Sequence, residues 1–413
     1  MKSVPPFPPR SLGKFQAKLL AWFRANRRAL PWRNTPPGRT GRDAYRVWVA
    51  EIMLQQTRIA AVLPYYERFL GRFPDVESLA KARESDVLKL WSGLGYYSRA
   101  RNLHRAAKEI VSRHAGKFPQ KFDEALALPG IGRYTAAAVL SIAYEVPLAV
   151  LDGNVARVLA RLGAVRGDLG NNGRWQRLNQ TAQQILAHRT PGDWNQALME
   201  LGETVCTPRS PRCGECPVSH WCRARALGLV DVIPAPRRKP APIRMKIAAA
   251  ILRDAHGRTL LVQDPGAHDG VLFSRMWQFP AVAVSRDAAT ELAAHLRATL
   301  GMECANGRPL QALRAARHGV TFRNITLLPF FARVEKLPRL PRTRVIALDR
   351  LAQLPISSAT RKIAAAAAHN DVAHLRPSLD QNSETADRHS HSGQRGAREK
   401  RPIAQGSGVF ARA

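Results

Sequence analysis

The chain has 413 residues, enough for two or three domains, and its 64 Lys and Arg residues against 31 Asp and Glu give a formal net charge of +33. This excess suits a polyanionic partner, with nucleic acid as the first choice. No apolar run approaches the ~18–20 residues of a membrane span, and the proline-rich start lacks a signal-peptide core. We therefore expect an intracellular protein without a membrane partner.

The first part of the chain shows helical periodicity in one segment after another. We predict helices over residues 12–25, 45–53, 64–70, 85–91 and 98–114. In the segment 45–53 the apolar residues form one stripe, and Glu51 lies off it. Periodicity alone therefore predicts a solvated Glu51.

Basic residues follow the segment 98–114, and their pattern predicts a solvated face. These residues are Arg99, Arg101, His104, Arg105 and Lys108.

Two turns in this part carry side chains of interest. Leu54-Gln55-Gln56-Thr57 follows the segment 45–53, and its glutamines could pair with base edges or cap neighbouring backbone. Gly93-Leu94-Gly95-Tyr96-Tyr97 breaks the next helical pattern with two glycines and two tyrosines. Such a loop could stack on bases, or it could be a tight turn with core tyrosines.

A proline and two glycines form the turn Leu128-Pro129-Gly130-Ile131-Gly132 between helices predicted over 122–128 and 135–143. This helix-hairpin-helix offers free backbone N–H groups that suit a phosphate. Asp152 follows in the turn-like Leu151-Asp152-Gly153-Asn154, before a helix predicted over 155–162. A helix N-cap is the structural interpretation of Asp152.

Four cysteines stand close together as Cys206-x6-Cys213-x2-Cys216-x5-Cys222, after helices predicted over 175–187 and 194–201. Four thiolates in one loop suit a tetrahedral zinc ion or a [4Fe–4S] cluster. The wide first gap favours iron–sulfur over zinc.

The pattern changes after a Pro-rich and basic linker at 230–244. We predict strands over 245–252, 259–263, 281–284, 324–328 and 330–334, with helices over 288–300 and 346–351. These elements predict a second, α+β domain over 245–370. Residues 371–413 have few apolar side chains, which predicts a disordered tail.

Several motifs in one order and spacing carry a resemblance to a known family. They are Leu30-Pro31-Trp32-Arg33, Glu51 to Thr57, Trp91 to Tyr97, the helix-hairpin-helix turn, Leu151 to Val155 and the four-cysteine loop. Over most of residues 15–225 the chain resembles the helix-hairpin-helix DNA glycosylases, and in detail the MutY adenine DNA glycosylases. The resemblance implies an all-α helix-hairpin-helix glycosylase domain over 11–229, with a cluster loop at 206–222, followed by an α+β Nudix-like domain.

The resemblance also implies catalytic roles. Glu51 becomes the acid that protonates a flipped adenine at N7, in place of a solvated glutamate. Asp152 then stabilises the cationic sugar or traps it covalently. Tyr134 occupies the position of the lysine that attacks the sugar in bifunctional relatives, which implies a monofunctional enzyme. We expect Tyr134 to donate its O–H to Asp152, and Asn154 to lie beside the sugar.

The resemblance assigns binding roles to further residues. Those around the adenine and the lesion are Trp32, Arg33, Leu54, Gln56, Thr57, Leu94, Gly95, Tyr96 and Glu200. Gly130 and Gly132 would contact the DNA backbone. A [4Fe–4S] cluster would be held by Cys206, Cys213, Cys216 and Cys222, and its loop would present Arg209 and Arg212 to phosphates.

The second domain resembles the Nudix-like module of the same family through Met276-Trp277-Gln278-Phe279-Pro280. Its predicted helix 288–300 offers only Glu291 where a hydrolytic Nudix box needs several glutamates, so we expect binding without hydrolysis. The family reads 8-oxoguanine through a Phe-Ser-His loop. Here Val320-Thr321-Phe322 follows His318, so we expect lesion recognition by His318, Thr321 and Phe322.

The sequence thus predicts a monofunctional glycosylase that removes adenine mispaired with 8-oxoguanine or guanine in double-stranded DNA. We expect a monomer in the cytoplasm of a bacterium, associated with the nucleoid. One rival is a pyrimidine-lesion glycosylase with lyase activity, against which Tyr134 and the second domain argue. The other is a non-catalytic, cluster-bearing DNA-binding protein, which would have no use for Glu51 and Asp152.

Overall fold

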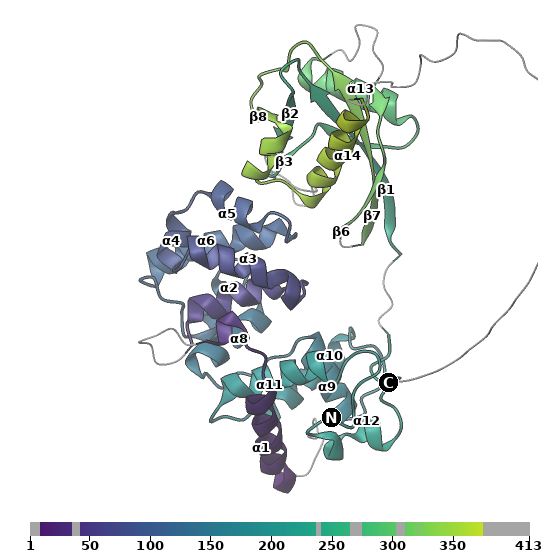
Figure 1. Cartoon of the computed structure of the whole chain (residues 1–413). Coiled ribbons are helices and arrows are strands. Elements are labelled where there is room, and N and C mark those ends of the chain that lie inside the picture. The colour runs from purple at the N-terminus through teal and green to yellow at the C-terminus, as the bar shows by residue number, and fades with distance from the viewer. Residues whose placement is uncertain are drawn as a thin grey trace, which may run out of the picture. The chain divides into compact units, whose positions relative to one another are not determined.

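The computed structural model describes residues 9–34, 42–236, 241–264, 275–302, 310–320 and 322–374. Within the compact unit that ends at Asn370, a helical region precedes a β-rich region (Figure 1). The predicted fold class, an all-α helix-hairpin-helix region followed by an α+β region, is confirmed. Among the helices of the described ranges, none combines the length and apolar character needed to cross a bilayer.

Short helices make up the first region. They are α1 (Pro9–Asn26), η1 (Pro31–Arg33), α2 (Ala44–Leu54), α3 (Ile59–Arg72), α4 (Val76–Lys81), α5 (Glu84–Trp91), α6 (Tyr97–Arg113), α7 (Phe122–Ala127), α8 (Arg133–Tyr144), α9 (Gly153–Leu162), α10 (Asn172–Gln184), α11 (Pro191–Thr204), η2 (Ser219–Trp221) and α12 (Arg223–Ala226).

Two differences from the sequence prediction have local causes. Helix α3 begins at Ile59, before the predicted start at residue 64, because Pro64 is accommodated inside it. Helix α4 was not predicted. Its six residues are too few for a periodic pattern, and a capping box between Asp75 and Ser78 defines its start.

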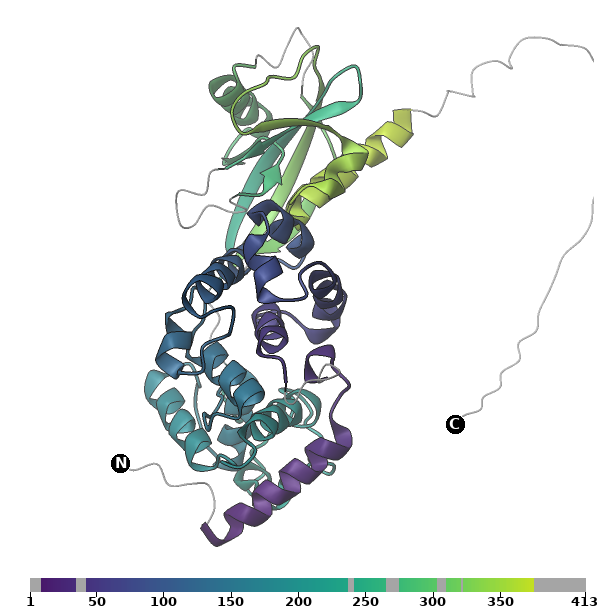
Figure 2. The same cartoon turned by 90° about the vertical axis from the view of Figure 1, so that its left-hand side faces the viewer.

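Two apolar cores hold the helical region together. The first is centred on the α2 stripe, where Trp48 and Met53 are at most 1% exposed, and it includes residues of α3, α5, α6 and α8. The second joins α1, α9, α10 and α11 around Trp194. Figure 2 shows α1, in purple, lying along the teal helices of this second core. Helix α8 contacts both α2 and α11, and α11 contacts α9, so side chains of all four helices converge.

The predicted hairpin is present between α7 and α8. Gly130 has φ +76°, and a Cβ at this position would lie 2.6 Å from the Cβ of Asn102. Glycine is therefore required by both the backbone and the space. The turn holds α8 in place and, with it, Tyr134.

A mixed sheet forms the β-rich region. Its strands are β1 (Ile243–Arg253), β2 (Arg258–Gln263), β3 (Trp277–Gln278), β4 (Ala281–Val284), β5 (Gln311–Ala312), β6 (Ala316–Val320), β7 (Arg323–Arg333) and β8 (Thr343–Ala347). The main order is β3-β2-β1-β7-β5, with β4 on β1, β6 on β7 and β8 on β2. Strands β1 and β7 run parallel over their whole length.

Helices cover the two faces of this sheet. Alternate residues of β1 point in opposite directions. Ala248, Ala250 and Leu252 pack with α13 (Ala288–Leu300), whereas Ala249 and Ile251 pack with α14 (Ser358–His374). The long buried run of β1 is therefore explained by apolar cover on both sides.

The structure corrects several predictions in this region. Strand β7 is continuous through Pro329, where two strands were predicted, because the neighbours β1 and β5 bridge that position. Residues predicted to begin a helix at 346 belong to β8, where Ile346 pairs with Thr259 before the 3-10 helix η3 (Leu348–Gln353). Pairing between distant segments here outweighs local pattern.

The ends of the predicted second domain also shift. Strand β1 begins at Ile243, inside the predicted linker. Strand β6 and helix α14 were not predicted, and α14 extends to His374, into the predicted tail. The rest of that predicted tail lies outside the described residues.

Candidate active site

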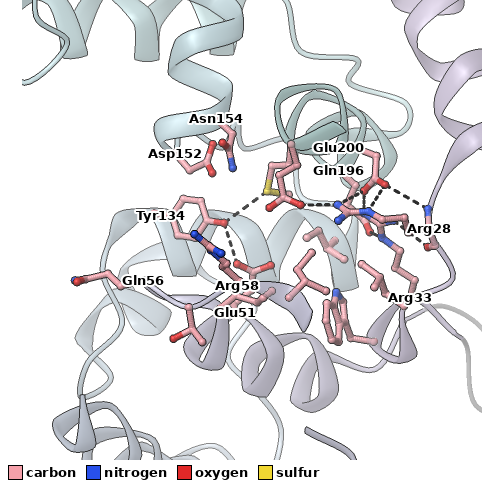
Figure 3. Close-up of a pocket in the computed structure, with 18 residues that line it drawn as sticks. Arg28, Arg33, Glu51, Gln56, Arg58, Tyr134, Asp152, Asn154, Gln196 and Glu200 are labelled. Carbon is pink, nitrogen blue, oxygen red and sulfur yellow. Dashed lines mark hydrogen bonds and ion pairs between the residues drawn. The ribbon is translucent and has the colours of Figure 1, made fainter. Parts of the chain in front are cut away.

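A pocket of about 360 Å³ opens where α2, α8, α11 and the N-terminus of α9 meet (Figure 3). Apolar side chains form part of its wall, and carboxylates, amides and guanidinium groups form the rest. Its lining residues are Arg28, Leu30, Trp32, Arg33, Glu51, Leu54, Gln56, Thr57, Arg58, Ile59, Tyr134, Ile142, Asp152, Asn154, Gln196, Met199, Glu200 and Glu203.

Glu51 lies in α2 and is only 6% exposed, so the solvated position predicted from periodicity is wrong. Burial raises its pKa to about 7, and the charges of Asp152 and Glu203 act in the same direction. The phenol of Tyr134 opposes this shift by donating a hydrogen bond to Oε2 of Glu51 at 2.9 Å. A carboxyl group with this pKa can hold a proton near neutral pH.

Asp152 is the N-cap of α9, as the structural interpretation predicted. Its Oδ1 accepts a hydrogen bond from the backbone N–H of Val155 at 2.7 Å. Burial raises the pKa of Asp152, while this bond lowers it. The expected hydrogen bond from Tyr134 to Asp152 is wrong, because the phenol is directed to Glu51 and to the sulfur of Met199.

The other end of the pocket is organised around Glu200 of α11, which is 1% exposed. Arg28 donates to Oε1 at 2.6 Å and to Oε2 at 2.9 Å, and Arg33 donates to Oε2 at 2.7 Å. Although burial raises the pKa of Glu200, the hydrogen bond from Arg28 and the charge of Arg33 outweigh it and lower the pKa overall. Arg33 also contacts Gln196, at 3.1 Å.

These contacts occupy Glu200 almost completely. The backbone N–H of Arg28 approaches Oε1 as well, at 3.3 Å, so each carboxylate oxygen has two donors. A carboxylate has about four acceptor positions in all. A ligand that donates to Glu200 must therefore replace an arginine contact.

Asn154 lies beside Asp152 at the N-terminus of α9 (Figure 3). Its Oδ1 accepts from Arg157 at 2.9 Å, and the same arginine donates to the backbone oxygen of Cys206 at 2.9 Å. The pocket and the first cysteine of the loop thus share one buried guanidinium.

The four cysteines are free and partly buried. Burial raises the pKa of Cys216 to about 12, and the charges of Cys206, Cys222 and Cys213 raise it further. Arg161 is 2% exposed and donates to Sγ of Cys206 at 3.3 Å. Such a set of sulfurs needs a positive group among them to be stable as thiolates.

The donor set fits an iron–sulfur cluster, because four cysteine sulfurs are the usual ligands of a [4Fe–4S] cluster. Beside them, Arg209 is exposed, whereas Arg212 forms an ion pair with Glu215 at 2.8 Å.

Several predicted site residues lie outside the pocket. Leu94 is buried in the first core, and Tyr96 is 38% exposed. Gln56, at the pocket rim, points away from Glu51 (Figure 3). The hairpin glycines Gly130 and Gly132 are exposed on the surface.

The lesion-recognition residues belong to the second region. His318 lies in β6, and its side chain is buried, so it supports the β6–β7 hairpin. Phe322 is 41% exposed at the tip, and Thr321 lies outside the described residues.

Several pocket residues were not predicted from the sequence. They are Arg28, Leu30, Arg58, Ile59, Ile142, Gln196, Met199 and Glu203. Helical spacing could have found part of this set, because Gln196 and Glu203 lie four residues before and three after Glu200 on one helix. Arg28 stands in an irregular segment and gave no such signal.

Two segments of the chain match models of known protein families. Residues 49–184 match the model of the HhH-GPD superfamily base excision DNA repair proteins. Residues 206–222 match the iron-sulfur binding domain of endonuclease III, so the cysteine loop is an iron–sulfur binding segment.

Two similar curated proteins are both named adenine DNA glycosylase. An adenine DNA glycosylase of Mus musculus is 37% identical over 312 residues, which cover 65% of this chain and 61% of the relative. An adenine DNA glycosylase of Homo sapiens is 46% identical over 214 residues, or 51% of this chain and 39% of the relative. The chain therefore spans about three fifths of the length of the mouse relative and about two fifths of the length of the human relative. A solved thermostable thymine-DNA glycosylase is 28% identical with a TM-score of 0.47, covering 53% of this chain and 98% of its own.

Proposed function

We propose that this chain, whose residues 49–184 match the model of the HhH-GPD superfamily, is an adenine DNA glycosylase of base excision repair. The observation that carries the proposal is that Glu51, whose pKa is raised by burial, and Asp152 line one pocket of about 360 Å³. Relatives named adenine DNA glycosylase support the choice of base.

The pocket suits a flipped purine base. Leu30, Trp32 and Ile142 offer apolar wall, and Arg33, Gln196 and Glu200 offer polar groups at one end. A base inside a duplex must leave the stack before an enzyme can reach its glycosidic bond. We infer that the exocyclic amine of adenine exchanges with one arginine contact of Glu200, which would give the pocket its choice of base.

The reaction follows from the positions of the two carboxyl groups. Glu51 donates its proton to N7, so that the base leaves neutral as the glycosidic bond breaks. Asp152 faces the resulting cationic sugar and stabilises it by charge or by a covalent bond. Glu51, now ionised, takes a proton from the water that attacks the sugar. Tyr134 holds Glu51 in place through the O–H bond at 2.9 Å.

A monofunctional reaction is part of the proposal. The pocket offers no lysine among its 18 lining residues, so a covalent imine with the sugar has no primary amine to form it. Tyr134 occupies the position where bifunctional relatives carry that lysine, and its phenol is engaged with Glu51.

We propose that the opposite base, 8-oxoguanine or guanine, is read by Gln56, Tyr96 and the exposed tip at Phe322. The β-rich region binds without hydrolysing nucleotides. The carboxylate of Glu291 accepts from the backbone N–H groups of Ser285 and Arg286, at 3.1 and 2.8 Å, and so is engaged in shaping a loop.

The cysteine loop would hold the cluster through Cys206, Cys213, Cys216 and Cys222. When bound, the cluster supplies positive charge that stabilises the thiolates and fixes the loop. We assign it no part in the chemistry of the base. The loop's exposed Arg209 is placed to meet phosphate. Monomeric state and a place on the bacterial nucleoid stay predictions.

One experiment tests the function. The full chain is incubated with duplexes that carry adenine opposite 8-oxoguanine, adenine opposite guanine, adenine opposite thymine, and oxidised pyrimidines. We expect breaks only at mispaired adenine and only after alkali, with no adduct trapped by borohydride. Excision of oxidised pyrimidines with borohydride trapping would favour the bifunctional rival. Tight DNA binding without any excision would favour the non-catalytic rival.

A further inference from the structure

Arg99 is a buried cation that the proposed reaction does not use. It lies in α6 and is 9% exposed, so the solvated face predicted for it is wrong. Burial lowers its pKa to about 10. In the described part of the chain no carboxylate forms an ion pair with it, although burying an unpaired charge is costly.

Backbone oxygens take the place of a carboxylate. Nη1 of Arg99 donates to the carbonyls of Ile52 and Met53, both at 2.9 Å, and to that of Gln55. These carbonyls end α2, the helix that carries Glu51. The negative end of the helix dipole therefore faces the guanidinium and stabilises it.

The same guanidinium contacts a second turn. Nη2 donates to the carbonyl of Gly95 at 3.2 Å and to Oγ1 of Thr57 at 3.2 Å. The ring of Tyr96 lies over the guanidinium, at 5.3 Å from its carbon. One planar group thus joins the turn after α2 to the turn before α6.

Each of these turns has a strained residue directly after a carbonyl that Arg99 holds. Gln56 has φ +56° and follows the carbonyl of Gln55, and Tyr96 has φ +49° and follows that of Gly95. Neither is glycine, so the left-handed conformation costs energy and persists only where neighbours enforce it. Arg99 supplies that enforcement to both turns at once.

Both strained residues present their side chains outward. Gln56 is exposed at the pocket rim, and Tyr96 is 38% exposed. From the arrangement we infer that Arg99 is a positioning residue that fixes the spacing of Gln56 and Tyr96, so that the two side chains enter a duplex as one unit and open the base pair beside the pocket. The inference rests on the proposed function, because it assigns Arg99 to the step before glycosidic cleavage.

Lysine cannot reproduce this contact. Arginine offers N–H donors in a rigid plane, which reach both carbonyls at fixed angles, whereas the ammonium of lysine is a point charge on a flexible stem. The test therefore uses Arg99→Lys, with Arg113→Lys as the matched control. Arg113 ends the same helix and is exposed away from both turns.

Two measurements report the step. Fluorescence of 2-aminopurine in place of the target adenine reports base opening, and single-turnover excision reports cleavage. We expect Arg99→Lys to lower both by about tenfold on duplex DNA, with an unchanged fraction of active enzyme by titration, and Arg113→Lys to match wild type. Wild-type values for Arg99→Lys would overturn the inference.

A double-variant comparison separates positioning from general support of the fold. In a Gln56→Ala/Tyr96→Ala background the effect of Arg99→Lys should shrink to about twofold or less, because the residues through which it acts are gone. The same tenfold loss in both backgrounds would mean that Arg99 only supports the fold. Where Arg99→Lys does not fold, Arg99→Gln removes the buried charge, keeps two N–H donors and carries the same expectation.

A further measurement distinguishes failure of this inference about Arg99 from failure of the proposed glycosylase function. If the wild type excises no adenine, hydrogen exchange of the free protein still decides the role of Arg99. The inference requires Arg99→Lys to speed exchange of the amides in 55–57 and 95–97 together. Unchanged exchange in either turn would overturn it.

Discussion

The phenol of Tyr134 and the carboxyl group of Glu51 share a hydrogen bond of 2.9 Å inside the pocket. Burial raises the pKa of Glu51 to about 7, and the bond from Tyr134 lowers it. A group that must give a proton and then take one works best with a pKa near the working pH. Tyr134 therefore adjusts the proton affinity of Glu51.

Tyr134→Phe should raise the pKa of Glu51 further, because the ionised form loses its donor. In the proposed reaction Glu51 acts as an acid while protonated, so excision should fall as pH rises through its pKa. We expect this alkaline fall to move up by about half to one pH unit in the variant. Single-turnover rates from pH 5 to 9 check it. Tyr144→Phe is the control, since Tyr144 ends the same helix and donates to Phe118 away from the pocket. A fall at unchanged or lower pH would contradict the role.

Asp152→Asn should abolish most excision and leave the fold intact. Asparagine caps a helix as well as aspartate does, so the bond to Val155 is kept while the charge facing the sugar is lost. We expect a loss of about a hundredfold to a thousandfold in single-turnover rate, with DNA affinity and melting temperature near those of wild type. Asp75→Asn, at the N-cap of α4, repeats the chemical change far from the pocket and should keep full activity. Retained excision by Asp152→Asn would remove Asp152 from the mechanism.

Glu51→Gln should stabilise the protein in a pH-dependent way. The folded-state pKa of Glu51 is raised from its ordinary 4.5 to about 7, so its proton stabilises the fold below pH 4.5, and this stability is lost as pH rises to about 7. Glutamine removes that loss. We expect a gain of about 3 kcal/mol in the free energy of unfolding at pH 8, little gain at pH 4.5, and no excision at either pH. Denaturation at both pH values measures it, with exposed Glu67→Gln as control. An equal effect at both pH values would speak against a buried, titrating Glu51.

Some features of the pocket residues could be predicted from the sequence and others could not. Asp152 was predictable as an N-cap, because the pattern before a helix is local. The burial of Glu51 was not, since periodicity reports one apolar stripe, and Glu51 lies on the side of α2 that meets Tyr134 of α8. Only the family resemblance pointed to its role. The burial of Arg99 was not predictable either, because its partners are mainly backbone carbonyls, which carry no sequence signal.

The fold, too, was predictable where local sequence patterns decide the structure and not where distant segments pair. Amphipathic helices and the hairpin glycines follow from near neighbours, so the predicted helices of the first region are present, although α3 starts earlier than predicted and α4 was not predicted. In the β-rich region, pairing between distant strands decides the outcome. Thus Ile346 and Ala347, predicted to begin a helix, belong to β8, and β7 is continuous through Pro329.

Purified protein should be brown, with about four irons per chain and a broad band near 400 nm. Loss of the cluster should weaken DNA binding more than folding, because we propose that Arg209 of the loop contacts phosphate. Arg209→Ala should lower affinity for all sequences and reduce the slope of log affinity against log salt by about one. Arg212→Ala should have a smaller effect, since Arg212 is paired with Glu215. Metal analysis checks the cluster, and a colourless protein with one zinc would refute it.

The last prediction concerns the base opposite adenine. An adenine pocket holds the same base whether its partner was thymine, guanine or 8-oxoguanine, so discrimination needs contacts to the other strand. A fragment without the β-rich region should therefore excise adenine but lose much of its preference for 8-oxoguanine over guanine.

The structure sets where this fragment must end. A cut at the predicted boundary, Leu229, would remove Ile233, which is 1% exposed and whose carbonyl accepts from Arg161 at 2.8 Å. The fragment should end at Pro236, which keeps this contact and the bond from Ala235 to Gly167.

The measurement is the ratio of excision rates on the two mispairs, for fragment and full chain. Losing one or two hydrogen bonds to the lesion should lower the ratio by ~1–3 kcal/mol in free-energy terms. Thr321→Ala and Phe322→Ala in the full chain should each reproduce part of the change, whereas Leu340→Ala, exposed elsewhere in the same region, should not. If the ratio is the same for fragment and full chain, the opposite base is read by the helical region, through Gln56 and Tyr96 without the tip at Phe322.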